Sequence, residues 1–181
     1  MIHKKSEPPD LKADAHLPAY IFLFGLSGAG KSYCGKVLAE RAGYQLHDLD
    51  QHLTEAMRGA IREKRSFTDE MRDEFFQIVG DVIEWVVTTT PRAVFTQGAY
   101  KQKHRASLRT RFPELRFLCV TASPQLLAER LSTRGDVVTP EYAASIAKNF
   151  EVDPEAPVLI NDRLSDDELF GRLQQLLRAA S

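Results

Sequence analysis

Residues Tyr20 to Ser32 read YIFLFGLSGAGKS. The first five of these residues are apolar and predict a buried strand. The segment from Gly25 to Ser32 then matches the pattern G-x-x-x-x-G-K-[ST] in full. A strand that ends in a glycine-rich turn, with Lys-Ser opening a helix, is typical of a phosphate-binding loop. The alternative, a glycine-rich turn that binds nothing, does not account for this order of elements.

The loop predicts nucleotide binding because backbone amides can crowd around a phosphate more closely than side chains can. Glycines permit positive φ angles, and the helix N-terminus adds partial positive charge. We expect Lys31 to reach the β- and γ-phosphates and the Ser32 hydroxyl to bind Mg²⁺. The expected ligand is therefore ATP with Mg²⁺, and Lys31 is a candidate catalytic residue. The residues expected to contact the nucleotide are Gly25, Ser27, Gly28, Ala29, Gly30, Lys31, Ser32 and Tyr33.

Composition is ordinary for a globular domain. The 181 residues are 43% hydrophobic and 27% charged, with a net charge of −1. This balance gives no basic surface for nucleic acid or an anionic membrane. Cys34 and Cys119 lack C-x-x-C spacing, which favours buried free thiols in a reducing compartment. We find no signal sequence and no apolar segment long enough to span a bilayer, and so expect a cytoplasmic protein.

Beyond a polar, proline-containing leader at residues 1–19, short β-rich segments alternate with helical patterns. The leader is expected to be flexible, and residues 20–181 to form a single domain. The alternation predicts an α/β fold, a parallel five-stranded sheet with helices on both faces. Strands are predicted at 20–24, 44–47, 93–96, 116–121 and 158–160, and helices at 31–42, within 52–89, and at 101–112, 124–133, 140–150 and 166–180.

Two carboxylates, Asp48 and Asp50, end the second predicted strand. Open α/β sheets bind ligands at the carboxyl ends of their strands, so this pair is expected beside the phosphate loop. We assign Asp48, with Ser32, to the Mg²⁺ site. Asp50 is expected to accept a hydrogen bond from an acceptor hydroxyl and to deprotonate it. The alternative is a turn with two solvated aspartates.

Three cations are candidates for binding an acidic acceptor. Arg72 lies one turn inside a helix that Thr68 is expected to cap. Lys101 and Arg105 follow the third strand and are four residues apart, which places them on one helical face. The alternatives are a surface arginine paired with neighbouring aspartates and a solvated basic helix.

A lid is predicted at about residues 130–140. Arg130 and Arg134 are four residues apart and precede Gly135, a candidate hinge. Mobile arginines of this kind neutralise phosphoryl oxygens and exclude water, so both are candidate catalytic residues. The alternative is pairing with Glu129 and Asp136 at the surface. Asn161 and Asp162, after the last strand, are candidates for a place near the nucleotide base.

Together these segments resemble the gluconate kinases, small P-loop phosphotransferases grouped with shikimate kinase and the nucleoside monophosphate kinases. The resemblance covers nearly everything after residue 19. It implies a sheet in the order 2-3-1-4-5, a lid, and transfer of the ATP γ-phosphoryl group to the terminal hydroxyl of a sugar acid, gluconate first. It rests on the phosphate loop, Asp48-x-Asp50, Thr68-Asp69-x-x-Arg72, Ala99-x-Lys101 with Arg105, Pro113-x-Leu115 and Arg130-Leu131-x-x-Arg134.

The chain departs from the gluconate kinase pattern at three places. Leu53 stands where that family usually has histidine, Val137-Val138 replaces a His-Phe pair in the lid, and Lys148-Asn149-Phe150 replaces Ser-Gln-Phe. Shikimate kinase is the alternative, although it normally has Gly-Gly-Gly after the third strand, where this chain has Gln97-Gly98-Ala99. A further alternative is an ATP-binding regulatory switch without phosphotransfer. The expected partner is a small acidic polyol, and a homodimer stays open.

Overall fold

The computed structural model describes residues 16–134 and 140–179. Five strands form one sheet in the order β2-β3-β1-β4-β5, and every neighbouring pair is parallel. The predicted fold class and strand order are therefore confirmed. The strands are β1 (Tyr20–Phe24), β2 (Gln45–Asp48), β3 (Ala93–Gln97), β4 (Leu115–Thr121) and β5 (Val158–Ile160).

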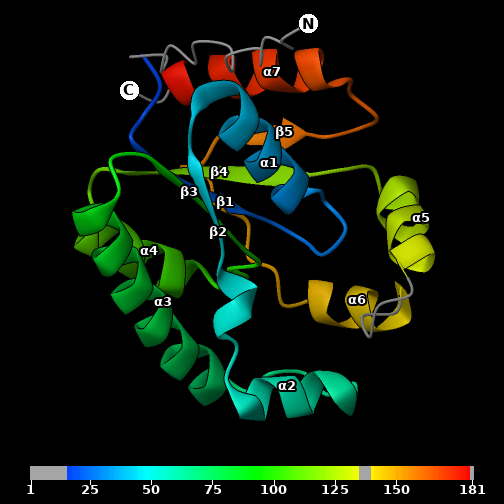
Figure 1. Ribbon diagram of the computed structural model, residues 1–181. Coiled ribbons are helices and arrows are strands. Elements are labelled where there is room, and N and C mark those ends of the chain that lie inside the picture. Colours follow the sequence, from blue (N-terminus) through cyan, green and yellow to red (C-terminus); the bar gives the residue numbers. More distant parts are fainter. Residues whose placement is uncertain (1–15, 135–139, 180–181) are drawn as a thin grey trace, which may run out of the picture.

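Helices cover both faces of the sheet: α1 and α7 lie together on one face, and α3 and α4 lie on the other (Figure 1). The short helices α2 and α6 lie beyond one end of the strands (Figure 1). The helices are α1 (Lys31–Ala42), α2 (Glu55–Arg62), α3 (Asp69–Thr89), α4 (Gln102–Arg111), α5 (Pro124–Arg134), α6 (Pro140–Ala147) and α7 (Asp166–Ala179), with a 3-10 turn η1 (Leu49–His52).

The helical stretch predicted between residues 52 and 89 is divided into two helices by threonine caps. The Thr54 hydroxyl accepts a hydrogen bond from the Met57 amide over 3.3 Å, and the Thr68 hydroxyl accepts one from the Met71 amide over 3.2 Å. Each cap satisfies an amide that has no partner within its helix, and so fixes where that helix begins. Thr68 thereby places Arg72 in the first turn of α3.

Strand β1 is buried on both sides, as its unbroken apolar sequence predicts. Ile21 and Leu23 pack toward α1 and α7, whereas Phe22 and Phe24 pack toward α3 and α4. Successive side chains of a strand point to opposite faces, so one five-residue strand supports two separate cores. The phosphate loop therefore starts from a rigid position at the centre of the sheet.

The register of the sheet brings the carboxyl ends of the first three strands to one edge. Phe24 lies opposite Gln97, and Asp48 lies opposite Thr96. The loop after β1, the acidic turn after β2 and the segment after β3 consequently leave the sheet side by side. This is the arrangement that a phosphate site facing an acidic pair requires.

The last residues of the expected leader are attached to the domain. Leu17 is buried among the side chains beneath α1, the Pro18 carbonyl accepts a hydrogen bond from the Tyr44 hydroxyl, and the Ala93 amide donates to the Ala19 carbonyl over 3.0 Å. Residues 1–15 of the leader and 135–139 of the expected lid lie outside the described residues. Among the helices of the described part, none has the length and apolarity that a bilayer span requires.

Candidate active site

The loop between β1 and α1 has the backbone shape that phosphate binding requires. Gly25, Gly28 and Gly30 have φ angles of 144°, 83° and 92°. At Gly25 a Cβ atom would lie 2.0 Å from the Val120 carbonyl oxygen, so only glycine fits between the loop and β4. Helix α1 begins immediately after Gly30, and its N-terminus faces the loop.

The outer side of the loop is held by hydrogen bonds to its carbonyls. Arg130 Nη1 donates to Gly28 O (3.2 Å) and Ala29 O (3.3 Å), and its Nη2 donates to Asn161 O (3.0 Å). The buried Asn161 side chain also donates to Ala29 O over 3.0 Å. Arg130, predicted as a lid arginine, therefore joins α5 to the phosphate loop. Arg134 ends α5, and its side chain lies outside the described residues.

Lys31 lies across the loop, with Nζ donating to the Gly25 and Leu26 carbonyls at 3.0 Å each. The neighbouring Tyr33 is exposed and contacts α7, because its hydroxyl donates a hydrogen bond to Asp166. Lys31 is thus positioned on the cavity side of the loop, whereas Tyr33 is on the side of α7.

Asp48 and Asp50 are held together in one turn. Asp48 Oδ1 accepts a hydrogen bond from the Asp50 amide over 3.1 Å at the start of η1, and the intervening Leu49 is buried. Asp50 and Lys31 both line one cavity at the strand edge, where Gln97 Nε2 donates to Asp50 Oδ1 over 3.3 Å. Asp50 therefore shares this cavity with Lys31 of the phosphate loop, and Asp48 lies two residues earlier, at the start of the same turn.

The pKa of Asp50 is raised above its ordinary value. Loss of solvation by the surrounding protein is the largest cause, the charge of Asp48 adds to it, and Lys31 and the Gln97 hydrogen bond oppose it. Asp50 as a whole residue is exposed, but its carboxylate lies against the cavity lining beside Gln97, where protein atoms displace part of its water and leave the charged form less well solvated. A carboxylate with a raised pKa is a stronger base, which suits removal of a proton from a hydroxyl.

The cavity has a volume of about 140 Å³, well below the roughly 300–1,000 Å³ of pockets that enclose drug-sized ligands. Its lining contains both polar and apolar side chains. This combination suits a small molecule with hydroxyl or acidic groups on a carbon skeleton. The polar residues include Ser27, Lys31, Asp50, Arg72, Gln97 and His104, and the apolar residues include Leu53, Met57, Phe67, Phe75 and Ile146.

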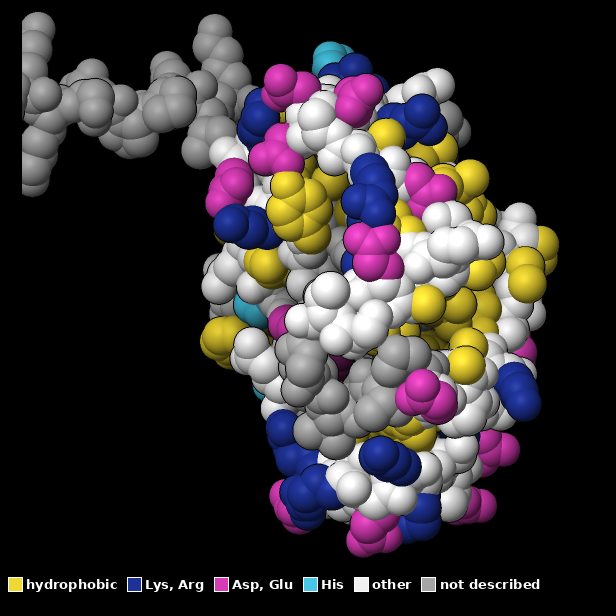
Figure 2. All heavy atoms as spheres, turned by 90° about the vertical axis from the view of Figure 1, so that its right-hand side faces the viewer, with side chains coloured by type: hydrophobic (Ala, Val, Ile, Leu, Met, Phe, Trp, Pro, Cys, Tyr) yellow, Lys and Arg dark blue, Asp and Glu magenta, His cyan; other side chains and the backbone are white. Residues whose placement is uncertain are grey.

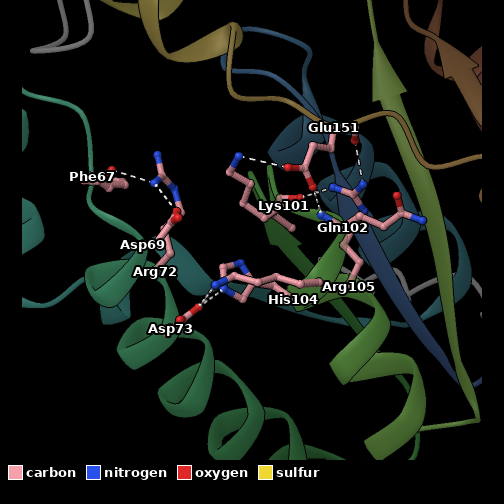
Figure 3. Close-up of polar contacts among 11 residues, drawn as sticks. Phe67, Asp69, Arg72, Asp73, Lys101, Gln102, His104, Arg105 and Glu151 are labelled. Atoms are coloured by element: carbon pink, nitrogen blue, oxygen red, sulfur yellow. Dashed lines mark hydrogen bonds and ion pairs between the residues drawn. The ribbon is translucent and has the colours of Figure 1, made fainter.

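Arg72 lies in the cavity wall, where the sequence predicted a clamp for an acidic acceptor. Its Nη1 donates to the Phe67 carbonyl (2.6 Å) and to Asp69 Oδ1 (3.3 Å), and its side chain is 12% exposed (Figure 3). The pairing with Asp69, which was the alternative, is thus present together with the position in the cavity. These contacts hold the guanidinium in a fixed orientation, and its planar set of donors matches a carboxylate.

Lys101 lies beside the cavity rather than in its lining. Its Nζ pairs with Glu151 Oε1 at 3.0 Å, and Glu151 Oε2 accepts a hydrogen bond from the Gln102 amide over 2.7 Å (Figure 3). Lys101 precedes α4 as its N-cap residue and has an extended backbone. The helical spacing that placed Lys101 and Arg105 on one face therefore does not apply.

The expectation that Arg105 binds the acceptor is corrected by the structure. Its side chain is fully buried and points toward the sheet (Figure 3). Nε pairs with Asp153 Oδ2 at 3.0 Å, Nη2 donates to Glu151 O at 2.7 Å, and the guanidinium lies 4.8 Å from the Phe24 ring centroid. Every face of this cation is used internally, so Arg105 stabilises the fold.

Sequence reasoning missed several residues of the cavity, among them His104 and Tyr142. His104 stacks on Phe76 with ring centroids 4.3 Å apart, and its Nε2 lies 2.7 Å from Asp73 Oδ1. Burial lowers the pKa of His104, although Asp73 opposes this effect, so the ring is neutral at pH 7. The Tyr142 hydroxyl donates to the Arg65 carbonyl over 2.7 Å and joins α6 to the segment before α3.

The predicted Mg²⁺ ligands fit the way this ion is usually bound. Mg²⁺ is typically held by one or two protein groups together with phosphate oxygens and water. Ser32 lies in the first turn of α1 and Asp48 ends β2, the two elements that border the phosphate loop and the acidic turn. Within the described ranges no three His, Cys, Asp or Glu residues form a metal cluster, and such a site needs none.

Charges on the face that carries α5 and α6 are mixed. Figure 2 shows basic and acidic side chains interspersed at both ends of this face, with no region of one sign. This agrees with a net charge of −1 over the whole chain. Electrostatic attraction by this face is therefore weak and unselective, and the local charges of the cavity are what select a ligand.

Comparison with known proteins shows which family shares this site. The shikimate kinase family matches residues 27–156, which includes the phosphate loop from Ser27, the acidic turn and the cavity. A shikimate kinase of Chlorobium phaeobacteroides is 32% identical over 120 residues, which cover 66% of this chain and 58% of that protein. The chain therefore spans well under two thirds of this relative's length.

Two further proteins extend the comparison to sugar substrates. A probable gluconokinase of Dictyostelium discoideum is 28% identical over 120 residues, covering 63% of this chain and 60% of that protein. The crystal structure of a sugar kinase from Janibacter sp. HTCC2649 superposes with a TM-score of 0.77 at 20% identity, covering 91% of this chain and 98% of that one. At that identity the likeness shows a common fold.

Proposed function

The chain belongs to the shikimate kinase family of P-loop small-molecule kinases, and from that premise we propose that it transfers the γ-phosphoryl group of ATP to a hydroxyl of a small carboxylated polyol. Gluconate is our first candidate for the acceptor. The observation that carries the proposal is that Lys31, Asp50 and Arg72 line one cavity. A phosphate-binding cation, a base and a carboxylate-binding group are thereby gathered around a space for one small molecule.

The proposed reaction uses each of these groups at a different atom. The acceptor hydroxyl oxygen attacks the γ-phosphorus, its proton passes to Asp50, and the bond to the bridging oxygen of ADP breaks. Lys31 and the loop amides stabilise charge on the phosphate oxygens. Mg²⁺, held by Ser32 and Asp48, would neutralise part of the nucleotide charge.

Arg72 supports an acidic acceptor. Among the described residues that line the cavity, it is the one guanidinium, and its fixed orientation suits one carboxylate. Binding that carboxylate would set the distance between the hydroxyl and the γ-phosphorus, which is the main contribution a kinase site makes. A lone carboxylate with several hydroxyls describes both gluconate and shikimate.

Two acceptors compete within this class. The spacing of the sequence motifs and the Dictyostelium relative, a probable gluconokinase, favour gluconate. Shikimate is the second candidate, because the Chlorobium relative at 32% identity is a shikimate kinase. We also keep a cytoplasmic location as a proposal, since ATP and small phosphorylated acids are cytoplasmic metabolites.

A steady-state screen tests the proposal. ADP formation is measured with Mg²⁺-ATP and with gluconate, shikimate or related polyol acids. One acid is expected to raise the rate well above the background without acceptor. Asp50→Asn should abolish acceptor phosphorylation while the affinity for ATP stays nearly unchanged. Asp81→Asn, at an exposed residue paired with Arg111, is the matched control and should keep full activity. The proposal fails if every carboxylated polyol leaves ADP formation at background.

A further inference from the structure

Tyr100 is a polar residue of the cavity that the mechanism above leaves without a role. It follows a strained turn: Ala99 has a φ of 44°, which is unfavourable for a residue with a Cβ atom. The turn is fixed on both sides, because the Gln97 side chain accepts a hydrogen bond from the Ala99 amide and the Glu151 amide donates to the Tyr100 carbonyl over 2.9 Å. Strain of this kind persists where the surrounding structure imposes it, and it is common at functional sites.

The turn folds the Tyr100 ring back over the end of β3. A Cβ atom at Gly98 would lie 2.9 Å from Tyr100 Cε1, so glycine is required there for the ring to pass. The ring also meets Phe150 edge-on, with centroids 5.6 Å apart and an interplanar angle of 78°. These contacts fix the ring, and Tyr100 lines the same cavity as Ser27 of the phosphate loop.

The Tyr100 hydroxyl is therefore set up as a donor. Burial raises its pKa and the charge of Asp50 adds to this, while the Ser27 contacts and Arg72 oppose it, so the phenol is protonated at pH 7. A protonated phenol offers its hydrogen to an acceptor, and its oxygen can accept a hydrogen bond at the same time. Lys31, Asp50 and Arg72, to which the proposed reaction assigns the phosphate and the acceptor, line the same cavity as Tyr100.

Ser27 and Lys31 are the phosphate-loop residues that line the cavity, so the γ-phosphate must meet the acceptor between them. We infer that Tyr100 is a further catalytic residue, whose hydroxyl, oriented by Ser27, donates a hydrogen bond to the γ-phosphoryl group as it passes to the acceptor. This inference rests on the proposed function. It assigns to the segment after β3 a contact with the transferred group, in addition to its place in the cavity wall.

Tyr100→Phe removes this one hydroxyl and keeps the ring over Gly98. The affinities for Mg²⁺-ADP and for a non-hydrolysable ATP analogue are measured by calorimetry, and kcat and KM are measured with the acceptor from the screen. Hydrogen bonds to charged groups contribute about 1.5–3 kcal/mol, so we expect kcat to fall about 10- to 100-fold. The analogue should bind several-fold more weakly, and the affinity for ADP should stay within about twofold.

The matched control is Tyr20→Phe. The Tyr20 hydroxyl donates hydrogen bonds to the Val87 and Thr90 carbonyls at the opposite end of the sheet. This control should change neither kcat nor the ratio of the affinity for the ATP analogue to the affinity for ADP. The inference is overturned if Tyr100→Phe leaves both quantities unchanged, or if it weakens ADP and the analogue equally, since either result limits Tyr100 to packing. This ratio of nucleotide affinities is measured without any acceptor. If Tyr100→Phe shifts the ratio but no acid is turned over, the proposed function is refuted while the contact between Tyr100 and the γ-phosphoryl group is retained.

A second variant tests the pairing with Ser27. If Ser27 acts by orienting the phenol, Ser27→Ala should lower kcat less than Tyr100→Phe does, and the double variant should match Tyr100→Phe. Losses that multiply in the double variant would show that the two hydroxyls act independently and would overturn the pairing.

Discussion

Gln97 Nε2 donates a hydrogen bond to Asp50 Oδ1 over 3.3 Å, from the end of β3 to the turn after β2. The two residues come from adjacent strands and are 47 positions apart in the chain. This bond is the direct contact between the segment that forms the cavity wall and the proposed base. It makes the protonation of Asp50 depend on both segments.

The first prediction concerns pH. The proposed base must be deprotonated, and its pKa is raised, chiefly by loss of solvation. As the pH falls through this raised pKa, Asp50 takes up a proton and kcat/KM for the acceptor should fall. The acidic limb of the pH profile should therefore lie above the ordinary range of an aspartate near 3.9.

Gln97→Leu tests the direction in which the pKa of Asp50 should move. The Gln97 hydrogen bond favours the charged carboxylate, so its removal should raise the pKa of Asp50 further and move the acidic limb to higher pH. The pH dependence of kcat/KM checks this with wild type and variant in the same buffers. A limb at the position of a free aspartate, unmoved by the substitution, would contradict Asp50 as the base.

The second prediction concerns the phosphate loop. In Gly25→Ala the new methyl group would overlap the Val120 carbonyl oxygen, and the residue would keep a φ of 144°. The loop must then move away from β4, so we expect the affinity for Mg²⁺-ATP to fall at least tenfold, with a loss of stability. Gly43→Ala is the comparison: that glycine ends α1 with open space around its Cβ position, so only backbone strain follows and ATP affinity should be retained.

The third prediction concerns the buried ion pair between Arg105 and Asp153. The sequence predicted that Arg105 binds the acceptor instead. Asp153 accepts hydrogen bonds from Arg105 and Arg109 at 3.0 and 2.9 Å. Asp153→Asn leaves Arg105 buried without its counter-charge, which should lower the free energy of unfolding by about 3–5 kcal/mol. Chemical denaturation at pH 7 measures it. Asp81→Asn, which alters an exposed pair, should stay within about 0.5 kcal/mol of wild type.

The same ion pair should make the free energy of unfolding fall at low pH. Burial alone would raise the pKa of Asp153, but hydrogen bonding and charge from Arg109, together with Arg105, hold it below its ordinary value. The stabilisation is therefore complete above the ordinary aspartate pKa, near 3.9, and is lost as the pH falls through the lowered one. An unfolding free energy unaffected by Asp153→Asn would show that the pair contributes nothing to stability.

The fourth prediction concerns acceptor recognition. Arg72→Lys keeps the charge but loses the planar pair of donors, so we expect the KM for the acceptor to rise about 10-fold or more while the KM for ATP changes little. Lys101→Met is the matched control, because Lys101 is a neighbouring cation outside the cavity lining. If Lys101→Met raised the acceptor KM as much as Arg72→Lys, carboxylate binding by Arg72 would be refuted.

Local patterns in the sequence predicted the fold well. The bounds of β1 and α1 were predicted to the residue, because an apolar strand, a glycine turn and a helix start are each encoded by adjacent residues. Asp50 and Arg72, two of the predicted site residues, both line the cavity. Both follow from simple geometry: a parallel sheet brings strand ends together, and a threonine cap fixes the first turn of a helix.

What depended on distant contacts was not predictable from a single sequence. The pairing of Lys101 with Glu151, and of Arg105 with Asp153, joins segments about 50 residues apart, and burial of Arg105 leaves no local signal. Tyr142 reaches the cavity because α6 folds back beside the segment before α3. Gln97 had a usable signal, since a polar residue at the end of a buried strand is placed at the ligand edge.

Isotope transfer tests the central claim most directly. Mg²⁺-ATP carrying a labelled γ-phosphoryl group is incubated with enzyme and gluconate, and in parallel with shikimate. We predict that the label appears in a phosphate monoester of one of these acids, in proportion to enzyme and not with Asp50→Asn. Label recovered entirely as inorganic phosphate or unreacted ATP, with either acid or any related polyol acid, would contradict phosphoryl transfer in this cavity.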